Sequence, residues 1–253
     1  MPSHPPNTRA QGSVGGTFAP AAEGIPLAPE EQVLLQGPMG RDRVLALVRG
    51  CLRDANTASD SVNQWLREGW ALQDIYLHGI VPAARLLGLW WLSDRLDFSA
   101  VTVGSSRLHR LLYDFSPVFL SEAKPQIQRS VLLMPEPGSQ HTMGIFMLSE
   151  FFRREGWFTQ LLSVGSVEEA LRNVEAHWFD VVAISVSSQR QLIEVQVLIA
   201  NLRRISPNPQ LAVMLGGPLV HSQPELLQGL GHDGTAYDAL EALEWASQAL
   251  ANR

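Results

Sequence analysis

The stretch SVLLMPEPGSQHTMG, residues 130–144, decides the prediction of the fold. It begins with an unbroken apolar run, which is typical of a short strand buried in a parallel sheet. A polar loop follows, and a helix is expected from Gly144 to Glu155. The same alternation repeats along the chain. Further strands are expected at 157–162, 180–185 and 211–215, with an edge strand at 235–237, and further helices at 166–178, 191–205, 224–228 and 238–250.

Strands that alternate with helices predict the α/β class. We therefore expect residues 129–253 to form a doubly wound, mostly parallel, five-stranded Rossmann-like sheet of the flavodoxin-like type. Ligands of such sheets bind outside the carboxyl ends of the strands.

Residues 41–120 predict a helical-bundle cap, because apolar side chains recur at helical spacing from Arg41 onward. We expect Ser59 or Asp60 to cap its second helix and Pro82 to lie in the first turn of its fourth. Residues 98–112 are ambiguous, because Val101-Thr102-Val103 favours a strand and the later leucines favour a helix. Pro117 is expected to begin a linker. Residues 1–40 are rich in proline and glycine, which predicts a disordered leader.

Composition excludes several classes of protein. The chain has 253 residues and a net charge of −6, from 19 basic and 25 acidic side chains, which argues against strong DNA binding by the chain alone. The single cysteine, Cys51, excludes an intramolecular disulfide. No apolar run approaches the length of a membrane helix, and the N-terminus has no secretory signal. We therefore expect a cytoplasmic protein that does not bind membranes.

Small and polar residues follow three of the predicted strands. Because parallel strands end at one edge of a sheet, these residues are expected to line one slot, with an imidazole at its mouth, that fits a large flat ligand with a slender tail. Each also has an ordinary explanation as a surface histidine, a helix cap or a turn. The candidates are Ser139, His141, Thr142, Met143 and Gly144 after the first strand, Ser185 and Ser187 after the third, and Gly216, Gly217 and Pro218 after the fourth.

Ser139-x-His141-x-x-Gly144, Ser185-x-Ser187 and Gly216-Gly217 together resemble the cobalamin-binding domain. The resemblance implies that His141 replaces the cofactor's own benzimidazole on cobalt and that the nucleotide tail passes the serines and glycines. Valine at Gly216 or Gly217 is then expected to block binding without unfolding the sheet. Ser139 stands where the family has aspartate, so we expect weaker axial ligation, since a serine adds no negative charge behind the imidazole.

The segment before the sheet resembles the helical cap that precedes cobalamin-binding domains, with Trp91 at the position of a tryptophan over the corrin. Light-sensing members carry a Glu-His pair that falls here on Val101-Thr102. That pair is therefore absent here, and through this absence and Ser139 the chain is similar instead to the AerR/PpaA antirepressors of purple bacteria. The resemblance implies a cobalamin-dependent, light-responsive transcriptional regulator that is not an enzyme. It would use adenosyl-, methyl- or hydroxocobalamin and act on a DNA-binding repressor of the CrtJ/PpsR type.

Two alternatives stay open. The chain could be a corrinoid methyl carrier of a methyltransferase system, since such carriers combine a helical cap with the same sheet. It could also be a heme-binding redox sensor with His141 as the iron ligand. His109 lies between Arg107 and Arg110 and is expected on a solvated face.

Overall fold

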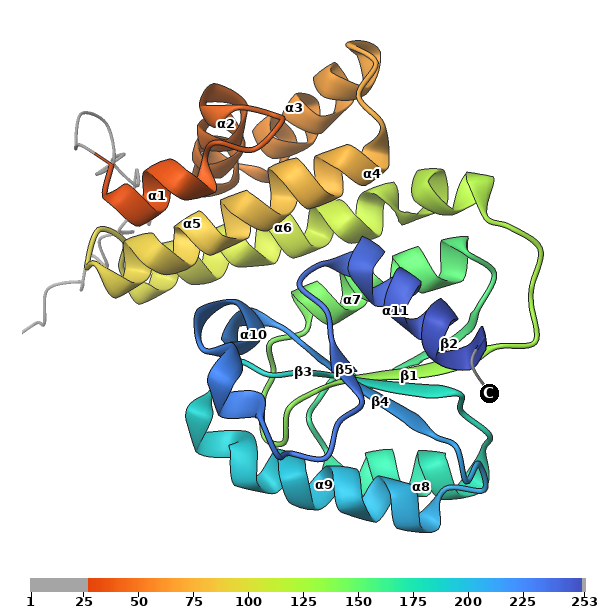
Figure 1. Cartoon of the computed structure of the whole chain (residues 1–253). Coiled ribbons are helices and arrows are strands. Elements are labelled where there is room, and N and C mark those ends of the chain that lie inside the picture. Colours follow the sequence, from red (N-terminus) through yellow and green to blue (C-terminus); the bar gives the residue numbers. More distant parts are fainter. Residues whose placement is uncertain (1–26, 252–253) are drawn as a thin grey trace, which may run out of the picture.

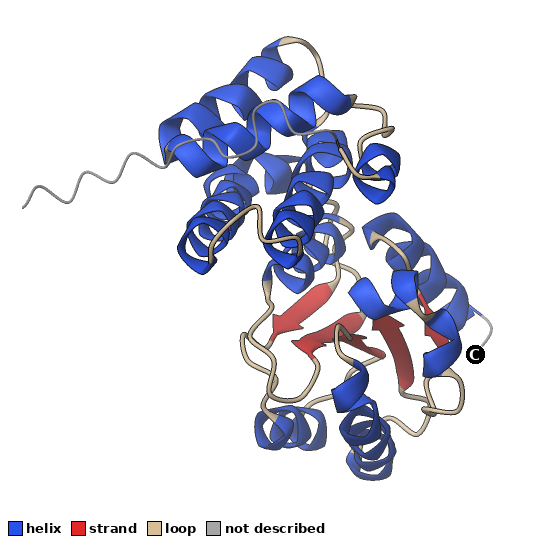
Figure 2. Ribbon diagram, turned by 90° about the vertical axis from the view of Figure 1, so that its left-hand side faces the viewer, coloured by secondary structure: helices blue, strands red, loops and turns tan. Residues whose placement is uncertain are grey.

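The computed structural model describes residues 27–251, which form a helical cap above a sheet domain (Figure 1). Residues 29–122 make up the cap and residues 130–251 the sheet domain. Seen along the sheet, the strands lie between two layers of helices, and the cap covers one of these layers (Figure 2).

The sheet confirms the predicted α/β architecture. Its strand order is β2-β1-β3-β4-β5, and every neighbouring pair is parallel. This is the doubly wound, flavodoxin-like order, whose switch point lies between β1 and β3. The strands are β1 (Ser130–Pro135), β2 (Phe158–Leu161), β3 (Val181–Ser185), β4 (Ala212–Gly216) and β5 (Gly234–Thr235).

Each face of the sheet is buried by its own pair of helices. α8 (Val167–Ala176) and α9 (Leu192–Ile205) cover one face through a core that includes Leu132, Val182 and Val213. α7 (Met143–Arg154) and α11 (Ala239–Ala251) cover the other. Because both faces are buried, the central strands are apolar except for a serine at the start of β1 and another at the end of β3. Short turns of helix, 3₁₀ at Gln189–Gln191 and Pro224–Leu227 and α10 (Pro218–Ser222), complete the domain.

The cap has one apolar core that extends into the sheet domain. Phe146, Met147 and Phe151 of α7 and Ala239 of α11 belong to the same buried cluster as the cap residues. α7 is therefore the element that joins the two halves. The cap helices are α1 (Pro29–Leu34), α2 (Arg41–Arg53), α3 (Ala55–Arg67), α4 (Leu72–Ile75), α5 (Val81–Leu92) and α6 (Phe98–Phe119), followed by a 3₁₀ turn at Leu120–Glu122.

The ambiguous segment is a single long helix. α6 begins after Asp97, whose side chain accepts a hydrogen bond from the Ala100 N–H at 2.7 Å. Leu108, Leu112 and Phe119 are buried along one face, and this packing outweighs the local strand preference of residues 101–103. The helix also runs past Pro117, so the linker begins later than predicted.

α3, the helix that we expected Ser59 or Asp60 to cap, begins earlier than predicted. Its N-cap is Asp54, whose carboxylate accepts the Thr57 N–H at 2.8 Å, and not Ser59 or Asp60.

The helix with Pro82 in its first turn, expected as a separate fourth helix, is continuous with the segment before it. A turn of π-helix, Tyr76–Ile80, joins α4 to α5. A proline ring clashes with the carbonyl four residues earlier in a regular α-helix, and a widened turn before Pro82 relieves that clash. The joined segment, Leu72–Leu92, is long and apolar enough to cross a membrane, contrary to the expectation from sequence. More than half of it is buried inside the protein, as in a core helix.

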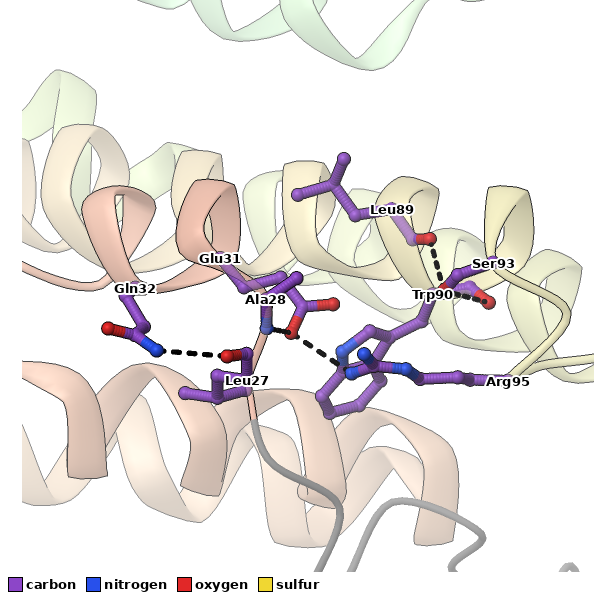
Figure 3. Close-up of polar contacts among 8 residues, drawn as sticks. All are labelled: Leu27, Ala28, Glu31, Gln32, Leu89, Trp90, Ser93 and Arg95. Atoms are coloured by element: carbon purple, nitrogen blue, oxygen red, sulfur yellow. Dashed lines mark hydrogen bonds and ion pairs between the residues drawn. The ribbon is translucent and has the colours of Figure 1, made fainter.

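The predicted leader is too long at its C-terminal end. Residues 1–26 lie outside the described part of the chain, but α1 follows and is anchored to the cap. Glu31 is 2% exposed, and its carboxylate accepts hydrogen bonds from the Ala28 N–H at 2.9 Å and from Arg95 at 3.0 Å (Figure 3). Leu35 and Met39 are also buried in the cap core. The packed protein therefore begins before Arg41.

Candidate cofactor-binding site

The predicted site residues meet at the carboxyl edge of the sheet. In the strand register Pro135 pairs with Ser185, and Ser185 pairs with Gly216. The loops that follow β1, β3 and β4 therefore begin at the same level. The first two flank the switch point between β1 and β3, which is where doubly wound sheets bind their ligands.

His141 is exposed in the loop after β1. The Ser139 hydroxyl lies 3.3 Å from His141 Nδ1 and accepts the His141 backbone N–H at 3.2 Å. Two backbone hydrogen bonds to Gly165 hold the loop. The Gly138 N–H donates to the Gly165 carbonyl at 2.9 Å, and the Gly165 N–H donates to the Ser139 carbonyl at 3.0 Å. Among the described residues, none is a partner of His141 Nε2. This nitrogen is thus available to bind a metal.

Glu136 is a site residue that sequence reasoning missed. It is 2% exposed, and its Oε2 accepts the backbone N–H groups of Ser187 at 3.0 Å and Ser188 at 3.2 Å, while Oε1 accepts the Ser187 hydroxyl. The carboxylate therefore ties the loop after β1 to the loop after β3. A glutamate between two prolines has the local pattern of a surface loop, and nothing local indicates its burial.

The two glycines at the carboxyl end of β4 have different roles. At Gly216, a Cβ atom would meet only the Ala236 carbonyl, at the ordinary contact distance of 3.6 Å. At Gly217, φ is +98°, and a Cβ atom would lie 2.7 Å from the Val186 carbonyl oxygen. The expectation that valine at Gly217 leaves the sheet intact conflicts with this geometry, because a side chain there would displace the backbone between β3 and β4. Of these two glycines, Gly216 is the one that borders open space beside Ser185.

The remaining predicted residues frame the site without direct polar contacts to it. Thr142 is the N-cap of α7, Met143 packs against the cap core, and the open side of Gly144 faces no atom within 4 Å. Pro218 is exposed at the first turn of α10. Trp91 lies in the last turn of α5 and is 48% exposed, and within residues 27–251 no hydrogen bond or ring contact joins its side chain to the loop of His141.

The cap reaches the same edge through Arg85. Its Nη2 lies 2.7 Å from Nε2 of His221 on α10, and this His221 nitrogen also lies 2.7 Å from the Tyr237 carbonyl oxygen. Burial, and next the charge of Arg85, hold the pKa of His221 below its ordinary value. α5 and α6 extend past the end of the sheet above α10 (Figure 1).

His109 is not on a solvated face. Its ring packs at 5.6 Å from the ring of Phe146 and at 5.0 Å from that of Tyr113, and its Nε2 is buried without a hydrogen bond among the described residues. Burial lowers its pKa. Its position at the contact between α6 and α7 explains the difference from the sequence expectation.

The donor set suits a metal that arrives in a macrocycle. No three His, Cys, Asp or Glu side chains gather within residues 27–251 to hold a bare ion. A corrin supplies its own equatorial nitrogens, so one imidazole completes the protein's share. His141 offers that imidazole, and Gly144 and Gly216 border space that a side chain would otherwise fill. These residues fit cobalamin.

The comparison with protein families agrees with this site. Residues 130–244 match the B12 binding domain. The sheet domain therefore resembles B12-binding domains over nearly its whole length, as the motif of residues 139–144 predicted.

Two similar proteins cover most of the chain. One is the "Uncharacterized 20.5 kDa protein in bchF-crtJ intergenic region" of Rhodobacter capsulatus, which is 28% identical over 163 residues, 64% of this chain and 84% of that protein. The other is the solved structure of the Methanosarcina barkeri monomethylamine corrinoid protein. It matches with a TM-score of 0.71 at 15% identity over 86% of this chain and 99% of that one, which shows a shared fold.

Proposed function

We propose that His141 is the cobalt ligand of the bound cofactor and that the nucleotide tail passes Ser185 and Gly216. The support is the free Nε2 of His141 at the switch point and the open space at Gly216. Ser139 holds the ring by a neutral contact, so the ligand would exchange more readily than one backed by a carboxylate.

We propose further that the protein is a light-responsive transcriptional regulator that acts as an antirepressor on a DNA-binding repressor of the CrtJ/PpsR type. The observation that carries this proposal is the name of its relative, which places that protein beside crtJ. The net charge of −6 supports action through a protein partner, because the chain has few cations to neutralise phosphates. Action on a repressor of this type implies a cytoplasmic location.

The contact between the cap and α10 offers a physical route for the signal. Bound alkylcobalamin supplies a cobalt–carbon bond that light breaks. Arg85 and His221 join the cap to the helix that begins at the Gly217 turn. A change at the edge of the sheet would alter how tightly the cap packs on α10. The cofactor can shift the equilibrium between the packed and released positions of the cap only if it binds the two with different affinities.

The test is capture of the repressor by the full chain in three forms: without cofactor, with adenosylcobalamin in the dark, and with the same sample after illumination. We expect the dark and illuminated forms to differ at least fivefold in captured repressor, with His141→Ala abolishing the difference. Equal capture in all three forms would contradict the switch. Tight, salt-sensitive DNA binding by the chain alone would contradict the antirepressor proposal.

A corrinoid methyl carrier is the second candidate. The match to the monomethylamine corrinoid protein favours it, although that match concerns the fold. Transfer of a methyl group from the methylcobalamin-loaded protein to a thiol, faster than from free methylcobalamin, would establish the carrier in place of the regulator.

A further inference from the structure

Glu136 determines how Ser187 can bond to a ligand. The Ser187 hydroxyl donates a hydrogen bond to Glu136 Oε1, while Oε2 accepts hydrogen bonds from the backbone N–H groups of Ser187 and Ser188. Three donors converge on one carboxylate, which is the arrangement of the ionised, acceptor-only form. A hydroxyl has one proton. Because the Ser187 proton is already engaged in the hydrogen bond to Glu136, the Ser187 oxygen can only accept further hydrogen bonds.

The charge of Glu136 strengthens this constraint. The carboxylate is 2% exposed, and no Lys, Arg or His within residues 27–251 forms an ion pair with it. A buried negative charge beside Ser187 repels anionic groups and favours a hydrogen-bond donor. The neighbouring Ser188 has a different task, because its hydroxyl accepts the Arg190 N–H at 3.3 Å.

We propose that Glu136 is a positioning residue that makes Ser187 an acceptor for a hydrogen-bond donor on the cofactor tail, such as a ribose hydroxyl or the amide N–H of the linker. The phosphate of the tail would then lie away from Ser187. This inference rests on the proposed passage of the tail along the carboxyl edge.

Glu136→Gln reverses the direction of the hydrogen bond between residue 136 and the Ser187 hydroxyl, while the side chain keeps nearly the same size. The amide oxygen of glutamine can still accept the two backbone N–H groups, and its NH₂ group would donate to the Ser187 oxygen. The Ser187 proton would then point away from residue 136, and the glutamine NH₂ group would occupy one of the two acceptor lone pairs of Ser187, so the contact with a donor on the tail would weaken.

The experiment is a double-mutant cycle on cobalamin affinity, measured by absorbance titration of Glu136→Gln, Ser187→Ala and the double variant. We expect each single variant to bind cobalamin about tenfold more weakly, and the double variant no more weakly than Ser187→Ala. Ser188→Ala is the matched control and should bind like the unaltered chain. Thermal unfolding followed by circular dichroism reports whether each variant is folded.

Cobinamide, which lacks the nucleotide, locates the donor. If Glu136→Gln binds cobinamide more weakly than the unaltered chain does, the donor is the linker amide. If the variant binds cobalamin more weakly but cobinamide equally well, the donor is the ribose hydroxyl. Multiplied losses in the double variant, or an unchanged Glu136→Gln, would overturn the inference while leaving cobalamin binding intact. Failure of the unaltered chain to bind cobalamin would instead overturn the proposed site, and this inference with it.

Discussion

In the proposed site, Ser139 would set the strength of axial ligation by His141. Its hydroxyl contacts His141 Nδ1 at 3.3 Å but brings no charge. Ser139→Asp would place a carboxylate behind the ring, which raises the basicity of the imidazole. We expect about tenfold tighter binding of hydroxocobalamin in an absorbance titration. Ser139→Ala should bind more weakly than the unaltered chain. A Ser139→Asp variant that binds no more tightly would show that Ser139 does not act through the ring.

The two glycines at the carboxyl end of β4 separate binding from folding. Gly216→Val would place a side chain in open space beside Ser185 and should abolish cobalamin binding with little change in melting temperature. Gly217→Val would force a strained φ and a backbone clash with Val186, so it should lower the melting temperature by several degrees. Binding titrations and thermal unfolding of both variants test this difference. A folded Gly216→Val that binds normally would show that the tail takes another path.

The local sequence is enough to indicate His141, Ser139 and Gly216, because strand ends and glycines leave local signals. It cannot indicate Glu136, since burial of a loop glutamate depends on residues 187 and 188, about fifty positions away. The role of Gly217 escapes sequence reasoning for the same reason. Its importance lies in the close approach of the Val186 backbone, and only the assembled sheet creates this contact.

At the scale of elements, α1 depends on one buried ion pair. Glu31 and Arg95 lie 3.0 Å apart with side chains 2% and 18% exposed. Arg95→Met would leave a buried carboxylate without its cation, and we expect a loss of about 3 kcal/mol in the free energy of unfolding, measured with urea. Arg110→Met breaks the exposed pair with Asp114 and should cost less than about 0.5 kcal/mol. Similar losses in the two variants would show that α1 contributes little to the cap.

Elements with strong periodicity are predictable within a few residues. β1, α9 and α11 differ little from the expected ranges, because unbroken apolar runs and helical stripes are local properties. α1 escapes prediction because proline and glycine dominate the chain around it, while its stability comes from the distant Arg95. The π-helical turn escapes prediction because it results from packing and from Pro82 within one long helix.

At the scale of the whole molecule, acid should weaken the packing of the cap on the sheet domain. Burial lowers the pKa of His221 below 6.5, with Arg85 adding to the effect and the Tyr237 carbonyl, Asp238 and Glu241 opposing it. The folded state therefore binds fewer protons than the unfolded state. Stability from His221 is complete above pH 6.5 and is lost as the pH falls below it.

We expect the melting temperature to fall as the pH decreases through this window. His109 and His232 act in the same direction, because burial lowers the pKa of each. His221→Gln should therefore reduce, but not remove, the acid sensitivity. Identical pH profiles for the variant and the unaltered chain, measured by thermal unfolding, would show that the contact between Arg85 and His221 does not titrate.

The central claim is that the protein supplies the imidazole on cobalt through His141. Electron paramagnetic resonance of the reduced, cobalt(II) form measures this directly, because the axial nitrogen splits each cobalt line. In ¹⁵N-labelled protein loaded with unlabelled cobalamin, the account predicts that the triplet splitting becomes a doublet and that His141→Ala loses it. A triplet that persists in the labelled protein would show that the cofactor keeps its own base, and it would contradict the account.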